Sequence, residues 1–138
     1  KEACAAYPGK IIVGIDAIEG MVATQGWAEV STVSAVTLAE DFADYGVEAI
    51  VYTDINCDGM MGGVNLEATK ELADHSPIPI IASGGVSKLA DVAAIREVAE
   101  ASAGGGIVGV ITGRAIYEGS LDLTLAQQLC DEEINHPD

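Results

Sequence analysis

Four short apolar runs alternate with longer segments of helical spacing along this chain, and this alternation restricts its fold more than any other feature. The runs cover residues 11–15, 49–53, 78–82 and 107–111, and the helical segments cover 34–45, about 66–75, 87–101 and 121–129. We expect a loop from Ala17 to about Ser31, and helix caps at Asn65 and Ser87. Runs that are apolar at consecutive positions are typical of strands buried on both faces. Strand–helix alternation implies parallel strands joined by right-handed crossovers. We therefore expect a single α/β domain over residues 1–138.

Four strand–helix units are half of what a closed parallel α/β barrel contains. Four helices on the outer face would leave the inner face apolar and exposed, with two edge strands unpaired. We therefore expect half of a TIM barrel, a (βα)4 unit completed by dimerisation or by a second half. The alternative is an open, flavodoxin-like sheet with helices on both faces, which needs no partner.

Two polar residues stand where strands of the expected sheet end. Asp16 directly follows the first apolar run, and Thr53 ends the second. The carboxyl ends of the strands carry the chemistry of a parallel barrel, so Asp16 is a candidate general acid or base. Asp16 alternatively caps the loop that follows, and Thr53 alternatively serves as ordinary β-branched strand packing.

Glycine-rich turns follow the third and fourth runs. Ser83, Gly84 and Gly85 come after one run, and Gly113 and Arg114 come after the other. Glycines let backbone amides approach a phosphate closely, and such a pair of loops is the usual phosphate grip of this fold. The alternative is tight turn geometry, with Arg114 paired to an acid at the rim.

The composition excludes several classes of function. The formal charge is −16, from 22 acidic and 6 basic residues, and this field repels nucleic acid and anionic membranes. The sequence has no apolar run of membrane-spanning length, and we expect no signal peptide. Three scattered cysteines, Cys4, Cys57 and Cys130, show no zinc spacing. We expect no disulfide, no metal and a cytoplasmic location.

Six segments support a resemblance to a known family. In chain order they are residues 14–17, 22–27, 52–55, 57–60, 80–86 and 113–119. Together they resemble the C-terminal half of the histidine-biosynthesis isomerase that acts on phosphoribosylformimino-aminoimidazole carboxamide ribotide. The related cyclase of the pathway shares the Ala-Ser-Gly-Gly segment, but the Gly-Trp at 26–27 and the Gly-Arg-Ala at 113–115 favour the isomerase.

The resemblance implies an Amadori rearrangement of an aminoaldose to an aminoketose, without any cofactor. Two carboxylates act as general acid and base, one from each half of the barrel. By resemblance, Asp16 is the carboxylate of this half, and Thr53 lies near the reacting sugar. Trp27 stacks on the imidazole ring of the substrate or anchors its loop on the rim. Asp58, with Gly59, binds polar groups of the substrate or forms a simple turn.

The chain departs from the family pattern at Ile18, Met21 and Cys57, where the family usually carries basic residues. This loss of positive charge bears on affinity for a substrate with two phosphates. Three functions therefore stay open: half of an active isomerase that needs an N-terminal half, a half-barrel homodimer that binds phosphosugars with little or no catalysis, and a structural module without chemistry. The sequence also leaves open whether phosphoribosylanthranilate is a second substrate.

Overall fold

The computed structural model describes residues 1–24, 29–57, 63–102 and 104–132, with side chains omitted at 29–32. The strands are β1 (Ile12–Ile18), β2 (Met21–Thr24), β3 (Glu29–Ser34), β4 (Ala49–Asp54), β5 (Ile80–Ser83) and β6 (Ile107–Ile111). The helices are α1 (Glu2–Ala6), α2 (Ala35–Asp41), α3 (Leu66–His75), α4 (Leu89–Ala101), α5 (Arg114–Glu118) and α6 (Leu123–Asp131).

The strands form one sheet in the order β3-β2-β1-β4-β5-β6. β1, β4, β5 and β6 are parallel neighbours, which confirms the four expected strands and their direction. β2 and β3 instead form an antiparallel hairpin beside the end of β1, where the sequence predicted a loop over 17–31. That expectation was wrong because Glu19 and Gly20, at φ 51° and 81°, form a tight turn that folds β2 back along the end of β1, and glutamate seldom signals such a turn.

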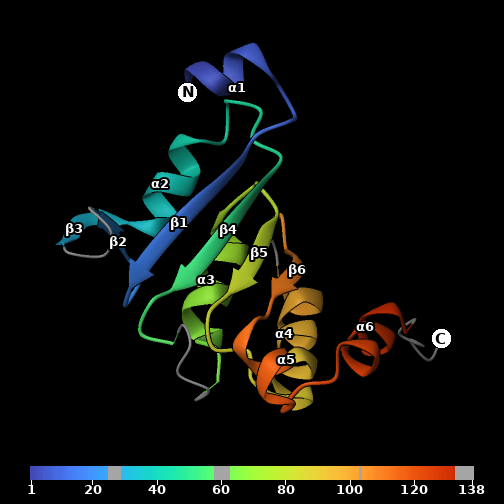
Figure 1. Cartoon of the computed structure of the whole chain (residues 1–138). Coiled ribbons are helices and arrows are strands. Elements are labelled where there is room, and N and C mark those ends of the chain that lie inside the picture. Colours follow the sequence, from blue (N-terminus) through green and yellow to red (C-terminus); the bar gives the residue numbers. More distant parts are fainter. Residues whose placement is uncertain (25–28, 58–62, 103, 133–138) are drawn as a thin grey trace.

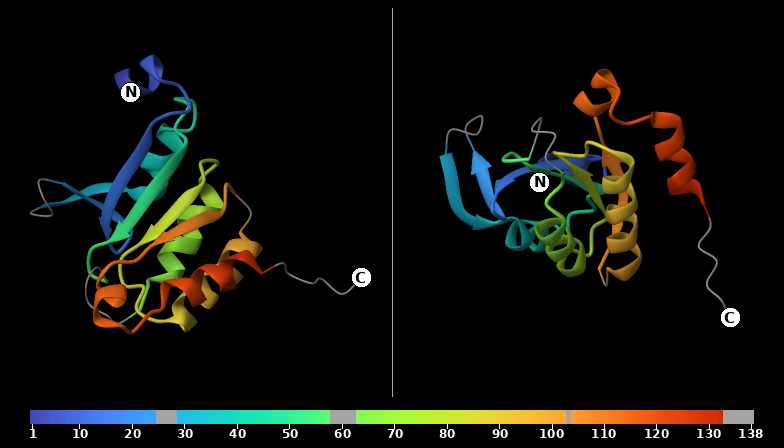
Figure 2. Two further views of the ribbon diagram at one scale, coloured as in Figure 1. Left: turned by 45° about the vertical axis from the view of Figure 1, so that its right-hand side comes forward. Right: turned by 90° about the horizontal axis from the view of Figure 1, so that it is seen from below.

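Helices α2, α3 and α4 lie on one face of the parallel strands, and α6 lies beside α4 (Figures 1 and 2). The strand side chains directed at these helices form the core, including Ile15, Ile50, Tyr52 and Ile80, each at most 2% exposed. The opposite face is more open. Ile12, which lies on that face at the amino end of β1, is 52% exposed. An open sheet with these helices on both faces is therefore not the fold of this chain.

Polar side chains fix where the helices begin. The Asn65 side chain accepts a hydrogen bond from the backbone of Ala68, as the sequence predicted for the start of α3. Ser87 was expected to cap the next helix, but Asp91 instead accepts hydrogen bonds from the backbones of Ser87 and Lys88. α1 and the short α5 were not expected, because five-residue helices show too little periodicity to be recognised.

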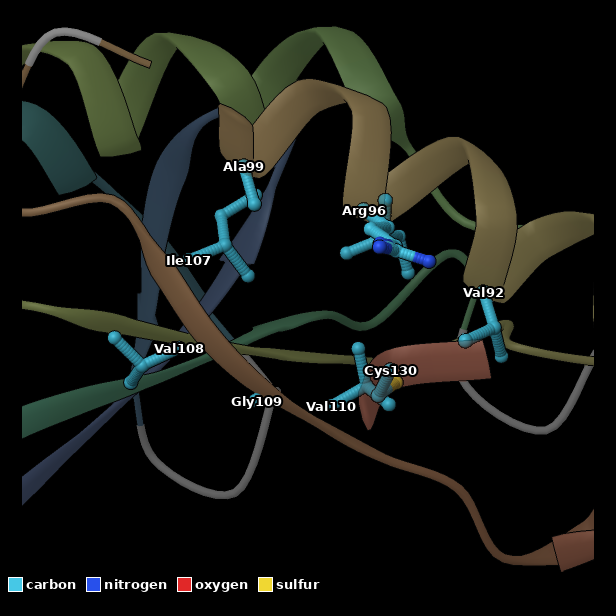
Figure 3. Close-up of a pocket in the computed structure, with 9 residues that line it drawn as sticks. Val92, Arg96, Ala99, Ile107, Val108, Gly109, Val110 and Cys130 are labelled. Carbon is cyan, nitrogen blue, oxygen red and sulfur yellow. The ribbon is translucent and has the colours of Figure 1, made fainter. Parts of the chain in front are cut away.

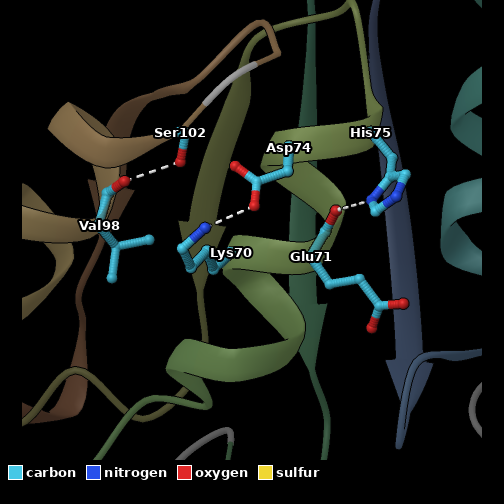
Figure 4. A network of polar contacts seen from close by, with 6 residues as sticks. All are labelled: Lys70, Glu71, Asp74, His75, Val98 and Ser102. Carbon is cyan, nitrogen blue, oxygen red and sulfur yellow. Dashed lines mark hydrogen bonds and ion pairs between the residues drawn. The ribbon is translucent and has the colours of Figure 1, made fainter.

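Side chains along α3 stabilise it locally (Figure 4). Lys70 and Asp74 form an ion pair at 2.5 Å one turn apart, and the His75 ring contacts the Glu71 carbonyl at 2.8 Å. Ser102 returns a hydrogen bond to the Val98 carbonyl at the end of α4. No helix in the described ranges has the length and apolar character to span a bilayer.

Candidate active face

Four side chains from four parallel strands stand in one row at the carboxyl ends of those strands. Asp16 is in register with Thr53, Thr53 with Ser83, and Ser83 with Ile111. Register partners on adjacent strands lie about 4.8 Å apart and point to the same side of the sheet. The structure therefore brings together three of the residues that the sequence singled out, on the face opposite the helices.

The row is accessible from solvent. Asp16, Thr53 and Ser83 are all partly exposed, whereas their neighbours Ala17 and Asp54 are buried toward the helices. The next row of the same face consists of Gly14, Val51, Ile81 and Gly109. A carboxylate and two hydroxyls thus lie above a small apolar layer, an arrangement that can bind a sugar and exchange protons with it.

Asp54 supports this row from the other face, and the sequence analysis missed it. The carboxylate is 3% exposed and accepts hydrogen bonds from the Asn65 side chain at 2.8 Å and from the Asn56 backbone at 3.0 Å. Because Asn65 also caps α3, Asp54 ties the end of β4 to the start of that helix. A buried acid that accepts two hydrogen bonds is a structural anchor.

The turn after β5 needs its glycines. Gly84 and Gly85 adopt φ 96° and 87°, which other residues rarely adopt. A Cβ on Gly85 would lie 2.2 Å from the Gly63 carbonyl oxygen and 2.9 Å from the Cys57 Cβ. The chain itself fills the space beside Gly85, so the tight-turn interpretation accounts for this glycine without a ligand.

Gly113 differs, because a Cβ there would meet no atom within 4 Å. Its segment is tied to the turn after β5 by hydrogen bonds from Thr112 to the Val86 carbonyl, at 3.3 Å, and from Ser120 to the Ser87 carbonyl, at 2.7 Å. The two predicted phosphate loops are therefore neighbours, and open space lies beside Gly113.

Arg114 begins α5 next to this space. Its guanidinium pairs with Glu118 at 2.7 Å, and both side chains are about half exposed. Pairing with an acid at the rim was one of the two interpretations that the sequence left open. An exposed pair of this kind is weak, so it leaves the guanidinium able to exchange partners.

The three departures from the family pattern all lie at this end of the sheet. Ile18 ends β1, Met21 begins β2, and Cys57 contacts the Gly85 turn. Burial, followed by the negative charge of Asp54, raises the pKa of the Cys57 thiol. Cys57 is therefore a neutral packing group at ordinary pH.

Trp27, Asp58 and Gly59 lie outside the described residues, so their predicted roles stay predictions. Over the ranges that the structure covers, no three His, Cys, Asp or Glu side chains are grouped to hold a metal ion.

Comparison with known proteins gives a consistent result. Residues 1–122 match the profile of a family described as histidine biosynthesis protein. Proteins named 1-(5-phosphoribosyl)-5-((5-phosphoribosylamino)methylideneamino)imidazole-4-carboxamide isomerase are 61% identical in Hahella chejuensis and 63% identical in Alkalilimnicola ehrlichii, each over 131 residues. These alignments cover 95% of this chain, and 52% and 51% of the two relatives. The chain thus spans about half the length of the curated relatives it matches, and it corresponds to half of their (βα)8 barrel.

Proposed function

We propose that this chain, which belongs to the histidine biosynthesis protein family, is the C-terminal half of an isomerase that converts a phosphoribosyl aminoimidazole carboxamide aminoaldose to the aminoketose. The row of Asp16, Thr53 and Ser83 carries the proposal, together with the identity to isomerases over nearly the whole chain. Fold membership alone would not support an activity, because related barrels host many reactions.

The row suits the proton transfers of this rearrangement. Ring opening needs a proton on the ribose oxygen, and loss of the C2 proton then gives an enaminol that tautomerises to the ketone. Asp16 supplies one of the two acid–base groups. Thr53, its register partner, hydrogen-bonds the sugar beside it. The second carboxylate comes from the other half of the barrel.

The linked loops after β5 and β6 are the proposed phosphate site. Open space at Gly113 leaves room for phosphate oxygens beside the first residues of α5. Arg114 adds a positive charge there, which offsets part of the chain's acidic field. The turn after β5 provides the opposite wall of the same site through Ser83 and Gly84, while Gly85 shapes the turn by packing against Gly63.

Pairing with a second half completes the barrel, and the open face and open edges support this. The β2–β3 hairpin pairs only with Ala17 and Ile18, so the described residues give β1 no partner on that edge over 12–16. At the other edge, the bulged Val108 of β6 is 64% exposed. A hollow of about 160 Å³ lies there between α4, β6 and α6, with apolar walls that include Val92 and Ile107 (Figure 3).

A second candidate function follows from the same edges. Two copies of this chain related by a two-fold axis would each offer a β1 edge to the β6 edge of the other. The resulting homodimer would carry two phosphate sites and two copies of Asp16, and would bind phosphosugars with little or no turnover.

Reconstitution tests the primary proposal. The chain is mixed with the N-terminal half of an imidazole-carboxamide isomerase, and substrate conversion is measured. We expect turnover that Asp16→Asn lowers by a factor of about 100 or more. The exposed Asp44→Asn is the charge-matched control and should retain the wild-type rate.

Conversion that survives Asp16→Asn unchanged contradicts the assignment of Asp16. Phosphate binding by the chain alone, with no turnover in the mixture, favours the homodimer. Cys4, Cys57 and Cys130 are free in the structure. The cytoplasmic setting stays a prediction.

A further inference from the structure

A separate cavity lies on the helix side of the sheet, away from the Asp16 row. It has a volume of about 300 Å³ and opens between the β1–β2 turn, the start of α2 and the middle of α3. Its lining residues include Glu19, Met21, Val36, Tyr52, Glu71 and Leu72.

Tyr52 is the buried polar group of this cavity. It is 1% exposed, and its hydroxyl takes part in none of the hydrogen bonds of the described residues. No side-chain oxygen sealed from solvent within the described part of the chain lacks a partner. The Tyr52 hydroxyl is therefore not sealed, and Tyr52 lines this cavity. A buried polar atom without a protein partner needs a partner in the space beside it.

Two glutamates line the same cavity, and no ion pair in the described part of the chain neutralises their negative charge. Neither Glu19 nor Glu71 belongs to any ion pair among the described residues. Figure 4 shows the Glu71 carboxylate on the far side of α3 from the Lys70–Asp74 pair. No lysine or arginine lines the cavity.

The negative charge around the cavity affects the pKa of Tyr52. Burial raises the pKa of Tyr52 to about 12, and the charges of Asp54 and Glu71 add to this effect. An adjoining hollow shares Glu19 and Glu71 and adds Glu67. The cavity therefore favours a positively charged group.

The remaining walls favour an organic cation over a bare ion. Met21, Val36 and Leu72 contribute apolar surface, which suits a short hydrocarbon chain. Nowhere in the described ranges are three His, Cys, Asp or Glu side chains grouped to hold a metal ion. A short alkyl group that ends in a positively charged hydrogen-bond donor matches this combination of walls.

We propose that this cavity binds a primary ammonium group carried on a short alkyl chain. The ammonium lies between Glu19 and Glu71 and donates a hydrogen bond to the Tyr52 hydroxyl, while the alkyl chain contacts Met21 and Leu72. The group belongs either to a free alkylamine or to a lysine side chain of a partner. This site is independent of the isomerase proposal, because it lies on the opposite face of the sheet from Asp16.

Calorimetric titration of the chain with n-pentylamine tests the proposal, with n-pentanol as the uncharged probe of equal length. We expect saturable binding of the amine and none of the alcohol at the same concentrations. Glu71→Gln and Tyr52→Phe should each weaken amine binding about fivefold. Glu40→Gln removes one charge from an exposed position on α2 outside the cavity and should change affinity little.

Equal binding of amine and alcohol would overturn the proposal. So would equal weakening by Glu40→Gln and Glu71→Gln, because the attraction would then come from net charge alone. N-acetyl-lysine methylamide separates the two sources: tighter binding than pentylamine indicates a lysine side chain, and weaker binding indicates a free amine.

Discussion

At the scale of single residues, the face of the strand on which a side chain lies decides its role. Thr53 and Asp54 are adjacent in β4, yet Thr53 joins the open row and Asp54 anchors α3 from the buried side. The sequence identified Asp16 and Thr53 because polar residues at strand ends are a strong signal. It did not indicate Asp54 or Tyr52. Asn65, which binds Asp54, and the glutamates that line the Tyr52 cavity are all distant from these residues in sequence.

Tyr52 makes stability depend on pH in the alkaline range. Burial raises its pKa from 10.0 to about 12, so the unfolded chain loses this proton before the folded chain does. Between those values the unfolded state binds fewer protons, and stability falls as pH rises. The full loss for this group is about 2–3 kcal/mol.

Tyr52→Phe should therefore lose less stability than the wild type between about pH 9 and about pH 11. Urea unfolding of both proteins at each pH measures the difference. Tyr117→Phe is the matched control, because Tyr117 is 90% exposed. Parallel pH dependence of wild type and Tyr52→Phe would contradict the burial argument.

At the scale of elements, long periodic segments were predicted well and short irregular ones were not. The four parallel strands and α3 with its Asn65 cap lie where the sequence placed them. The helix expected over 34–45 ends at Asp41, and the last helix is displaced to begin at Leu123 after α5. Tertiary contacts decide such ends, since local propensity differs little between a last helical turn and a loop.

The two glycine turns should respond differently to alanine. Gly85→Ala places a methyl group 2.2 Å from the Gly63 carbonyl at a φ of 87°, so we expect a loss of more than about 2 kcal/mol in the free energy of unfolding. Gly113→Ala meets open space, so it should keep the fold and weaken phosphate binding.

Urea unfolding and phosphate titration of both variants check this pair. Gly113→Ala with unchanged phosphate affinity would remove the loop after β6 from the proposed site. Gly85→Ala with wild-type stability would show that the Gly63 segment moves away freely.

At the scale of the whole molecule, the four parallel strands form a layer covered on one face. Gly14, Asp16, Val51, Thr53, Ile81 and Ser83 make up the centre of the other face. Ile111 ends the row of Asp16, Thr53 and Ser83 on this face and is 48% exposed. Apolar side chains of this kind become buried when a second half closes over the sheet.

Ile111→Lys should prevent that closure, because an ammonium group would lose its water inside the completed barrel. We expect the wild-type chain to sediment as a dimer, and Ile111→Lys to sediment as a monomer with an unchanged circular dichroism spectrum. Tyr117→Lys adds the same charge at a highly exposed site on α5 and should remain dimeric. A wild-type chain that stays monomeric as its concentration rises would contradict the homodimer.

The sequence alone determined the strand–helix order, the parallel direction and the strand-end positions of Asp16, Thr53 and Ser83. These follow from hydrophobic periodicity and chain connectivity, which are local properties. Only the tertiary structure decided that these three side chains form one row, that Gly85 is packed against Gly63, and that Tyr52 lies beneath two carboxylates. Strand register and helix packing bring distant residues together, and no local pattern encodes those contacts.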